Sequence, residues 1–205
     1  MNIAVIGTGN IGGGLAKAWM RKGHRIFLGT RNPLSKGVRS LVLLNEDLIS
    51  AHAPEVAAQK AEIVLLAVPA DVTFDVVDQL GNLDGKVIID AMNAVFNKPQ
   101  GFYKTSEAIL AACGSDHIVK AFNMIGAENM DNPVYGDECA DLFICGQHNS
   151  DKEKVMQLAT DAGFRPFDIG GIEMESALES LASIWGRLAF TTDLGRNIAF
   201  KVLQR

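Results

Sequence analysis

The sequence has no excess of basic residues. Among its 205 residues, 19 are Lys or Arg and 24 are Asp or Glu, which gives a formal net charge of -5. Surfaces that bind nucleic acid usually carry a dense basic patch, and no segment of this chain is rich in Lys and Arg. We therefore expect no nucleic-acid partner.

Long hydrophobic runs are also missing. The longest apolar run, Ile63–Ala70, is much shorter than the roughly 20 residues that cross a bilayer. The N-terminus has no charged region followed by a small-residue cleavage site, so it does not resemble a signal peptide. These features predict a cytoplasmic protein that binds no membrane.

Cysteine and histidine are scarce. The three cysteines, Cys113, Cys139 and Cys145, are odd in number and lack the spacing of metal ligands. We expect them to act as small hydrophobic residues in a reducing compartment. The four histidines are scattered, without an i, i+4 pair, and no Ser-His-Asp or Cys/His arrangement follows a predicted strand. The sequence therefore predicts no metal site and names no catalytic residue.

Strand-like runs alternate with helical stretches up to residue 170. Hydrophobic residues make up 48% of the chain and charged residues 21%, as in a globular protein with a large core. Strands are predicted over Asn2–Ile6, Arg25–Gly29, Ile63–Val68, Lys86–Asp90, His117–Phe122, Ala140–Cys145 and Arg165–Ile169. Helices are predicted over 10–21, Ala70–Leu80, Ser106–Ala112 and Asp151–Ala162. This βαβ rhythm predicts an α/β protein of Rossmann type, with a doubly wound and mostly parallel sheet in a domain spanning residues 1–170.

The composition changes after Gly170-Gly171. No strand is predicted from Glu173 onward, and apolar residues recur at helical spacing between Ala177 and Ala189. A further helix is predicted over Thr192–Leu203. Residues 171–205 are thus expected to form a small helical C-terminal element, which packs over the open end of the sheet or forms a homodimer.

A glycine pattern lies between the first strand and the first helix. The sequence Gly7-Thr-Gly9-Asn-Ile-Gly12 has G-x-G-x-x-G spacing in the strand–turn–helix context that this pattern requires. The first glycine permits the tight turn, the second lets the backbone approach a pyrophosphate, and the third allows close packing of helix on strand. The helix N-terminus adds unpaired N–H groups and a positive dipole end. The pattern predicts a dinucleotide site formed by Gly7, Thr8, Gly9, Asn10, Ile11 and Gly12.

Two further glycines follow this pattern. We expect Gly14 to permit close packing under the dinucleotide. Gly13 has no such explanation, although a glycine inside a helix costs about 1 kcal/mol relative to alanine. Our hypothesis is that a side chain at Gly13 would crowd a second substrate ring or the C-terminal element. The alternative is a tolerated glycine in the first helical turn.

The end of the second strand distinguishes the two nicotinamide cofactors. A site for NAD places Asp or Glu there to bind the ribose hydroxyls, whereas this chain reads Leu28-Gly-Thr-Arg-Asn-Pro33 and has no acid until Glu46. Arg31 can bind a 2′-phosphate through paired N–H groups, and Thr30 and Asn32 can add neutral hydrogen bonds. The sequence therefore predicts NADP(H). The weaker candidates for the same phosphate, expected to be surface charges, are Lys36 and Arg39.

Other candidate residues follow from a general property of open α/β sheets, which bind ligands at the carboxyl ends of their strands. This rule selects Asn93 and Asn123, whose amides can bind a carboxamide or a flat ring, although each can also be a turn residue that bonds its own backbone. Lys120 lies in a predicted strand and is expected to be exposed or to contact a phosphate. The rule also selects apolar residues that can flank a ring, namely Ala67, Val68 and Pro69.

These segments together resemble a known family, the deazaflavin-dependent (coenzyme F-420) NADP oxidoreductases, over nearly the whole chain. The similarity is carried by the glycine turn with Gly14 and by Gly29–Pro33, Val119–Ile125 and Asp168–Ile172. A related domain forms the cytosolic part of the metalloreductases, which pass NADPH electrons to a flavin. The resemblance implies that Asn123, Met124 and Ile125 line the site of the second ring. Where this chain has Asn123 the archaeal enzymes have His, so this position is closer to the metalloreductases.

The sequence therefore predicts an NADPH-dependent oxidoreductase that transfers hydride between NADP(H) and a small-molecule acceptor, a deazaflavin such as coenzyme F-420 or a flavin such as FMN or FAD. Hydride transfer between stacked rings needs positioning more than proton transfer, which agrees with the lack of an evident general acid. One alternative is a reductase of a small imine or carbonyl, similar to the pyrroline-5-carboxylate reductases, although the C-terminal part is short for their helical dimer core. A second alternative is a redox sensor that binds NADPH without oxidising it.

Overall fold

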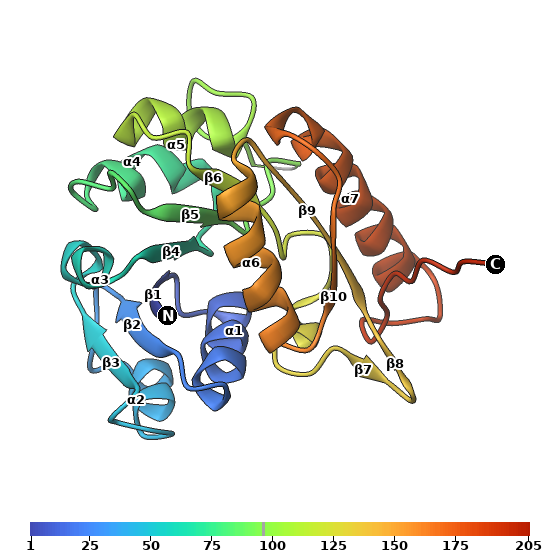
Figure 1. Cartoon of the computed structure of the whole chain (residues 1–205), viewed down its shortest axis with the longest axis horizontal. Coiled ribbons are helices and arrows are strands. Elements are labelled where there is room, and N and C mark those ends of the chain that lie inside the picture. Colours follow the sequence, from blue (N-terminus) through green and yellow to red (C-terminus); the bar gives the residue numbers. More distant parts are fainter. Residues whose placement is uncertain (96) are drawn as a thin grey trace.

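The computed structural model describes residues 1–95 and 97–205. Its centre is an eight-stranded sheet in the order β10-β9-β6-β5-β4-β1-β2-β3 (Figure 1). The strands of this sheet are β1 (Asn2–Ile6), β2 (Arg25–Gly29), β3 (Ile49–His52), β4 (Ile63–Leu66), β5 (Val87–Asp90), β6 (Ile118–Lys120), β9 (Asp141–Gly146) and β10 (Arg165–Asp168). Neighbouring strands pair in parallel except β6 and β9, which are antiparallel. The prediction of a doubly wound, mostly parallel α/β sheet is confirmed.

Helices cover both faces of this sheet (Figure 1). One hydrophobic core lies under α1 (Asn10–Arg21), α2 (Lys36–Val42), α6 (Asn149–Asp161) and α7 (Glu175–Thr191). The other lies under α3 (Pro54–Lys60), α4 (Thr73–Asp78) and α5 (Thr105–Cys113). None of the helices that the structure describes has both the length and the apolar character that a bilayer crossing needs.

Strand β1 shows why both faces need cover. Ile3 and Val5 belong to the first core, whereas Ala4 and Ile6 belong to the second. None of these four side chains is more than 2% exposed. A strand buried on both faces reads as a continuous apolar run, as central strands of parallel sheets do.

Short connecting elements complete the chain. Three 3-10 turns are η1 (Ala70–Val72), η2 (Ala127–Asn129) and η3 (Ile172–Met174), and a separate two-stranded ribbon pairs β7 (Val134–Tyr135) with β8 (Glu138–Cys139). The predicted bounds of β1 and β2 are confirmed, but α2, β3 and α3 were not predicted. These three elements are short, and β3 is fully buried at Ile49 alone, so their apolar pattern is weak.

The C-terminal element contains one long helix, α7, over the predicted apolar repeat. Its Trp185 is 7% exposed and lies against Gly126, where a Cβ would overlap the indole ring. Glycine is therefore required at position 126, because α7 packs closely on the loop after β6. The division of the chain after residue 170 stays a prediction.

The second predicted C-terminal helix, Thr192–Leu203, is wrong. Residues 192–205 contain turns and irregular backbone without helix or strand. Trp185 Nε1 donates to the carbonyl of Ile198 at 2.9 Å, and the N–H of Val202 donates to Asp141 Oδ2 at 2.6 Å. In a helix, that N–H and that carbonyl would bond each other, because they are four residues apart. Tertiary partners on α7 and β9 take both groups and pull the tail away from helical geometry.

Two of the consecutive glycines in α1 are required by packing. A Cβ on Gly12 would lie within 3.0 Å of the carbonyl of Gly7, so no larger residue fits there. A Cβ on Gly14 would lie 2.8 Å from the Cβ of Met130, the residue that follows η2. The close packing of helix on strand predicted for Gly12 agrees with this geometry, whereas the packing of Gly14 under a dinucleotide stays a prediction.

Gly13 has no such restriction. A Cβ on Gly13 would meet Leu41 Cδ1 and the carbonyl of Thr8 at 3.6 Å, an ordinary van der Waals distance, and no other described atom within 4 Å. Gly13 therefore faces α2, and the hypothesis of a clash with the C-terminal element is wrong.

The variant Gly13→Ala is expected to raise the free energy of unfolding by up to about 1 kcal/mol, because alanine favours a helix and meets no close contact here. The matched control Gly14→Ala is expected to lower it, because the new methyl group overlaps Met130. Urea unfolding followed by circular dichroism measures both changes. A destabilised Gly13→Ala protein would show that this glycine has a structural role.

Candidate dinucleotide site

A cleft of about 630 Å³ opens at the carboxyl ends of β1, β2 and β4. β1 lies between β2 and β4 in the sheet, and ligands of open α/β sheets bind at such a point, where the connections diverge. We call this cavity the nucleotide cleft. Eight of the predicted cofactor residues line it, namely Gly7, Thr8, Gly9, Thr30, Arg31, Ala67, Val68 and Pro69.

The turn from β1 to α1 excludes side chains from the floor of this cleft. Gly7 has φ +100°, and a Cβ on it would overlap the carbonyl of Ala67 just beyond β4. Gly9 is the N-cap of α1, with extended backbone and no side-chain cap, and a Cβ on it would meet no described atom within 4 Å. The first turn of α1 contains no acidic residue. Uncapped N–H groups at a helix N-terminus favour an anion.

The loop after β2 is held by a hydrogen bond to the end of β3 and by two bonds within the loop. The N–H of Thr30 donates to the carbonyl of His52 at 3.0 Å. The N–H of Asn32 donates to Thr30 Oγ1 at 3.1 Å, and Asn32 Oδ1 accepts from the N–H of Leu34 at 3.2 Å. Asn32 thus stabilises the loop and does not line the cleft. Arg31 is exposed at the rim and takes part in none of the ion pairs found within residues 1–95 and 97–205.

Other residues of the glycine motif lie behind or beside the cleft. Gly12 is buried against the Gly7 carbonyl, and Ile11 is half-buried on the first hydrophobic core. Asn10 lines a neighbouring groove of about 590 Å³ between α1, α2 and η2. These three residues shape the turn and its outer side and form none of the cleft wall.

Part of the wall was not predicted. The residues concerned are Ile6, Gly29, Pro54, Val72, Asp75, Val76 and Gln79. Four of them follow one another at i, i+3, i+4 and i+7, so they share one helix face. The predicted helix Ala70–Leu80 contains this signal. Pro54 could not be found in this way, because it begins α3, an element that was not predicted.

Asn93 and Asn123 form a reciprocal pair beyond β5 and β6. Asn93 Nδ2 donates to the backbone carbonyl of Asn123, and Asn123 Nδ2 donates to Asn93 Oδ1, both at 2.8 Å. Asn123 is 3% exposed, and its Oδ1 has no hydrogen-bond partner among the described residues. Buried acceptors normally have partners, so this oxygen is suited to an N–H donor from a ligand.

The other two residues implied to line the ring site lie in the core. Met124 is fully buried, and its Sδ lies 3.5 Å from the N–H of Phe143 on β9. Ile125 is 4% exposed in the same core. Of the implied ring-site residues, Asn123 alone therefore presents an unsatisfied polar atom.

The backbone just before Asn123 is strained. Phe122 has φ 63°, in the left-handed region that residues other than glycine rarely adopt. Its ring is fully buried and packs edge-on against Trp19 and Phe164, with centroids 5.8 and 5.9 Å away. Such a conformation costs about 1–3 kcal/mol and persists where the surroundings enforce it. This aromatic packing therefore fixes the direction in which Asn123 points.

A second cavity, of about 360 Å³, lies between the loop after β5 and α7. We call it the α7 pocket. It is lined by Asn93 and Val95 and, from α7, by Ala182, Ser183, Gly186, Arg187, Phe190 and Thr191. Of the asparagine pair, Asn93 lines this pocket, and Asn123 is joined to it by the two hydrogen bonds.

Lys120 is neither exposed nor close to a phosphate site, so the sequence-based expectation for it is wrong. Its ammonium is fully buried and lies 3.1 Å from Asp90 Oδ2, 3.2 Å from Glu175 Oε1 and 3.3 Å from Glu179 Oε1. Glu179 Oε1 also accepts from the N–H of Ala94 at 2.9 Å. This group, which we call the Lys120 cluster, joins β5, β6 and α7 and holds the loop that carries Asn93.

Burial and charge act in opposite directions within the Lys120 cluster. Burial raises the pKa of Asp90, and Lys120 offsets this only in part. Burial alone would lower the pKa of Lys120, but the three carboxylates hold it well above its ordinary value. Burial alone would raise the pKa of Glu175, but Lys120 and a hydrogen bond from Ser106 bring it below its ordinary value. At neutral pH the cluster therefore contains a charged Lys120 and a charged Glu175.

The variant Lys120→Met is expected to lower the free energy of unfolding by about 3–5 kcal/mol at neutral pH, because it leaves buried carboxylates without their counter-charge. The loss is expected to shrink in acid. The lowered pKa of Glu175 stabilises the parent above the ordinary carboxyl pKa, and this stabilisation disappears as the pH falls through the lowered value. Denaturant unfolding at neutral and acid pH measures the difference.

The control for this variant is Lys154→Met, at an exposed lysine of α6. It is expected to change the free energy of unfolding by less than about 0.5 kcal/mol. A Lys120→Met loss that is equally small, or that does not change with pH, would contradict the role given to the Lys120 cluster.

Two of the three cysteines, Cys113 and Cys145, are not activated nucleophiles. All three are free, with Cys145 buried and Cys113 and Cys139 partly exposed. Burial raises the pKa of Cys145 to about 12 and also raises the pKa of Cys113. Protonated thiols are poor nucleophiles, so these two residues act as small hydrophobic side chains, as expected.

Known proteins with similar sequences include two metalloreductases. Residues 2–94, from β1 to the loop after β5, match the family described as NADP oxidoreductase, coenzyme F420-dependent. Mouse metalloreductase STEAP2 is 27% identical over 184 residues, and rat metalloreductase STEAP3 is 24% identical over 181 residues. These matches cover 88% and 87% of this chain but 36% of each relative, so the chain spans little more than a third of their length.

Solved structures extend the similarity to the whole chain. A candidate F420-dependent NADP-reductase from Arthrobacter sp. FB24 is 25% identical, with a TM-score of 0.84 and full coverage of both chains. A hypothetical protein from Sinorhizobium meliloti is 27% identical, with a TM-score of 0.72, covering 100% of this chain and 96% of that one. Plasmodium falciparum pyrroline carboxylate reductase with NADP bound shares the fold, at 15% identity and a TM-score of 0.62, covering 92% of this chain and 65% of that one.

These comparisons agree with the predicted class, because the matching family is described as NADP oxidoreductase and a solved structure with the same fold is described as a candidate F420-dependent NADP-reductase. The resemblance to the coenzyme F420-dependent NADP oxidoreductases is confirmed over residues 2–94, a segment that includes the glycine turn, Arg31 and the end of β4. The predicted cofactor, NADP(H), is the one that this family uses.

Proposed function

We propose that this protein transfers hydride between NADP(H), bound in the nucleotide cleft, and a deazaflavin or flavin held next to the asparagine pair and the α7 pocket. The observation that carries the proposal is the composition of the cleft. It joins a bare helix N-terminus to an exposed arginine at the end of β2 and has no carboxylate in the loop after that strand.

The residues of the cleft fit NADP(H) in both charge and shape. The N–H groups at the start of α1 would bind the pyrophosphate, because the open space at Gly9 lets a phosphate approach them. Arg31 would bind the 2′-phosphate through charge-assisted hydrogen bonds. Val68 and Pro69 would supply apolar contacts for a flat ring. The bound nicotinamide would supply or accept the hydride.

The asparagine pair would orient the reacting ring. Asn123 Oδ1, which lacks a partner among the described residues, would accept a hydrogen bond from a carboxamide or ring N–H group. The strained Phe122 and the contacts of Asn93 hold this oxygen in place before a ligand binds. Positioning of this kind is what hydride transfer requires of a protein.

Two other functions remain as alternatives. Reduction of a small imine or carbonyl is favoured by the shared fold of pyrroline carboxylate reductase. A redox sensor would bind NADPH in the same cleft without turnover. The α7 pocket favours an enzyme, because it offers space for a second molecule beside Asn93.

The proposal also places the protein in the cytoplasm and predicts that it forms a homodimer. Three free cysteines agree with a reducing cytoplasm. A homodimer stays a prediction. On α7, Ile184 is 50% exposed and Phe190 is 65% exposed, and such side chains on one helix are suited to a contact between two copies.

The variant Arg31→Ala is expected to weaken NADPH binding by about 1.5–3 kcal/mol, the range for a charged hydrogen bond, and to leave NADH binding unchanged. The matched control is Arg25→Ala, because Arg25 is also exposed and begins the strand that Arg31 follows at the other end. Fluorescence titration with both cofactors measures the effect. Equal NADPH affinity in the two variants would remove the role of Arg31.

The acceptor is tested by following NADPH absorbance with one added compound at a time. Coenzyme F-420, FMN, FAD and pyrroline-5-carboxylate are the compounds to compare. Faster oxidation with a deazaflavin or flavin supports the proposal. Acceleration by pyrroline-5-carboxylate alone would replace it with the imine reductase, and no acceleration together with tight NADPH binding would replace it with the sensor.

A further inference from the structure

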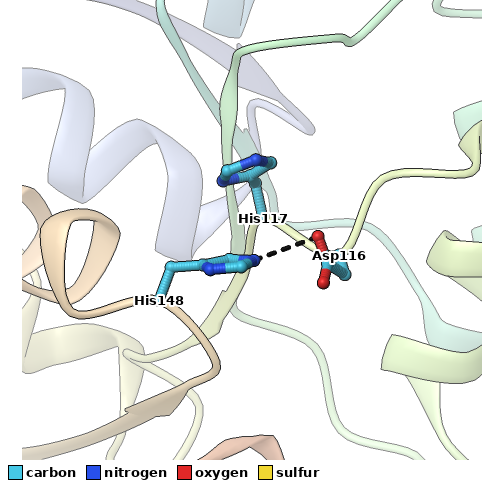
Figure 2. Close-up of side chains that lie close together, drawn as sticks. All are labelled: Asp116, His117 and His148. Carbon is cyan, nitrogen blue, oxygen red and sulfur yellow. Dashed lines mark ion pairs between the residues drawn. The ribbon is translucent and has the colours of Figure 1, made fainter.

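Three polar side chains meet where β6 begins, at the end of the sheet opposite the carboxyl ends that border the nucleotide cleft. Asp116 and His117 lie just before β6, and His148 lies just after β9, at the N-cap of α6 (Figure 2). β9 runs antiparallel to β6, with Gly146 paired to Val119, so the end of one strand meets the start of the other. Residues far apart in sequence thus form one cluster, which we call the His–Asp cluster.

The side chains of this cluster are close enough to share one ligand. His148 Nε2 lies 3.0 Å from Asp116 Oδ1. The two imidazole rings are stacked, with centroids 4.4 Å apart and planes inclined by 29°. One nitrogen from each histidine and one carboxylate oxygen all lie within 4.8 Å of one another.

A buried carboxylate orients one of the histidines. His117 Nδ1 lies 2.7 Å from Asp151 Oδ2, and Asp151 is 4% exposed in the first turn of α6. This contact directs one nitrogen of the ring to Asp151 and leaves Nε2 available. A carboxylate behind a histidine in this way is the usual outer partner of a metal-binding histidine, because it fixes the ring and raises its basicity.

We propose that Asp116, His117 and His148 bind a divalent transition-metal ion, with Zn²⁺ as the best match. Two imidazoles and one carboxylate form a common zinc ligand set, whereas Mg²⁺ and Ca²⁺ prefer oxygen ligands alone. The fourth position is left to water. This site was not predicted from the sequence, because the two histidines are far apart in the chain and their meeting depends on the antiparallel pairing of β9.

Binding requires the stacked rings to turn, because a metal ion lies in the plane of each imidazole that binds it and these two planes are inclined by only 29°. Ligand atoms of a tetrahedral zinc ion lie about 3.3 Å apart, since each is about 2.0 Å from the metal. Asp151 holds His117, so His148, whose side chain is 35% exposed, would make the larger movement. The ion would link the start of β6 to the start of α6, at a distance from the nucleotide cleft, and would therefore stabilise this edge of the sheet without taking part in hydride transfer.

Isothermal titration of the whole protein with Zn²⁺ tests the site. One ion per chain is expected, and a saturating excess of about one hundred times Kd is expected to raise Tm by about 5 °C or more. The variants His148→Ala and Asp116→Asn are expected to weaken binding at least about tenfold, and Asp151→Asn by about tenfold through the orientation of His117. The matched control His52→Ala, on β3, is expected to bind Zn²⁺ as the parent does.

Two results would overturn the proposal. One is an affinity for Zn²⁺ that stays the same in His148→Ala, with thermal unfolding showing that the variant is folded. The other is an intense thiolate band in the near-ultraviolet spectrum after Co²⁺ is added, which would assign the metal to a cysteine. A Co²⁺ spectrum without that band, lost in His148→Ala and kept in His52→Ala, supports nitrogen and oxygen ligands at this site.

Discussion

The β1–α1 turn packs against the residue that follows β4, and the nucleotide half of the protein depends on this close approach. Gly7 lies against the Ala67 carbonyl and Gly12 against the Gly7 carbonyl, at positions where a Cβ would not fit. The lack of side chains leaves the first N–H groups of α1 uncovered and opens the cleft between the loops after β2 and β4. In the proposed site, anion binding therefore follows from strand–helix packing, and Arg31 adds only the preference for a 2′-phosphate.

Local features of the chain were predictable, and features that depend on distant partners were not. The bounds of β1 and β2, the glycine turn and the position of Arg31 follow from short-range patterns, and the structure gathers eight of the predicted residues around one cleft. Lys120 was misjudged because its carboxylate partners on α7 lie more than fifty residues away in the chain. The predicted helix after Thr192 fails for a similar reason, since its backbone groups bind Trp185 and Asp141 instead of each other.

The Lys120 cluster gives the C-terminal helix a defined position. Apolar packing of α7 alone would tolerate small shifts along the sheet, whereas a buried ammonium with three carboxylates is satisfied in one arrangement. Since Glu179 also accepts from the N–H of Ala94, the same arrangement sets the loop that carries Asn93. The α7 pocket and the asparagine pair are therefore placed by one set of charges, although Ala94 and Glu179 are 85 residues apart in the chain.

Phe122 connects the proposed ring site to the aromatic side chains of the core. Its left-handed backbone is held by contacts with Trp19 on α1 and with Phe164, and Asn123 follows it directly. Aromatic packing in the core thus sets the direction of the Asn123 amide. In the evolution of this fold, a change of acceptor can begin with a substitution in that aromatic group, so the positions that alter specificity need not lie among those that line the cavities.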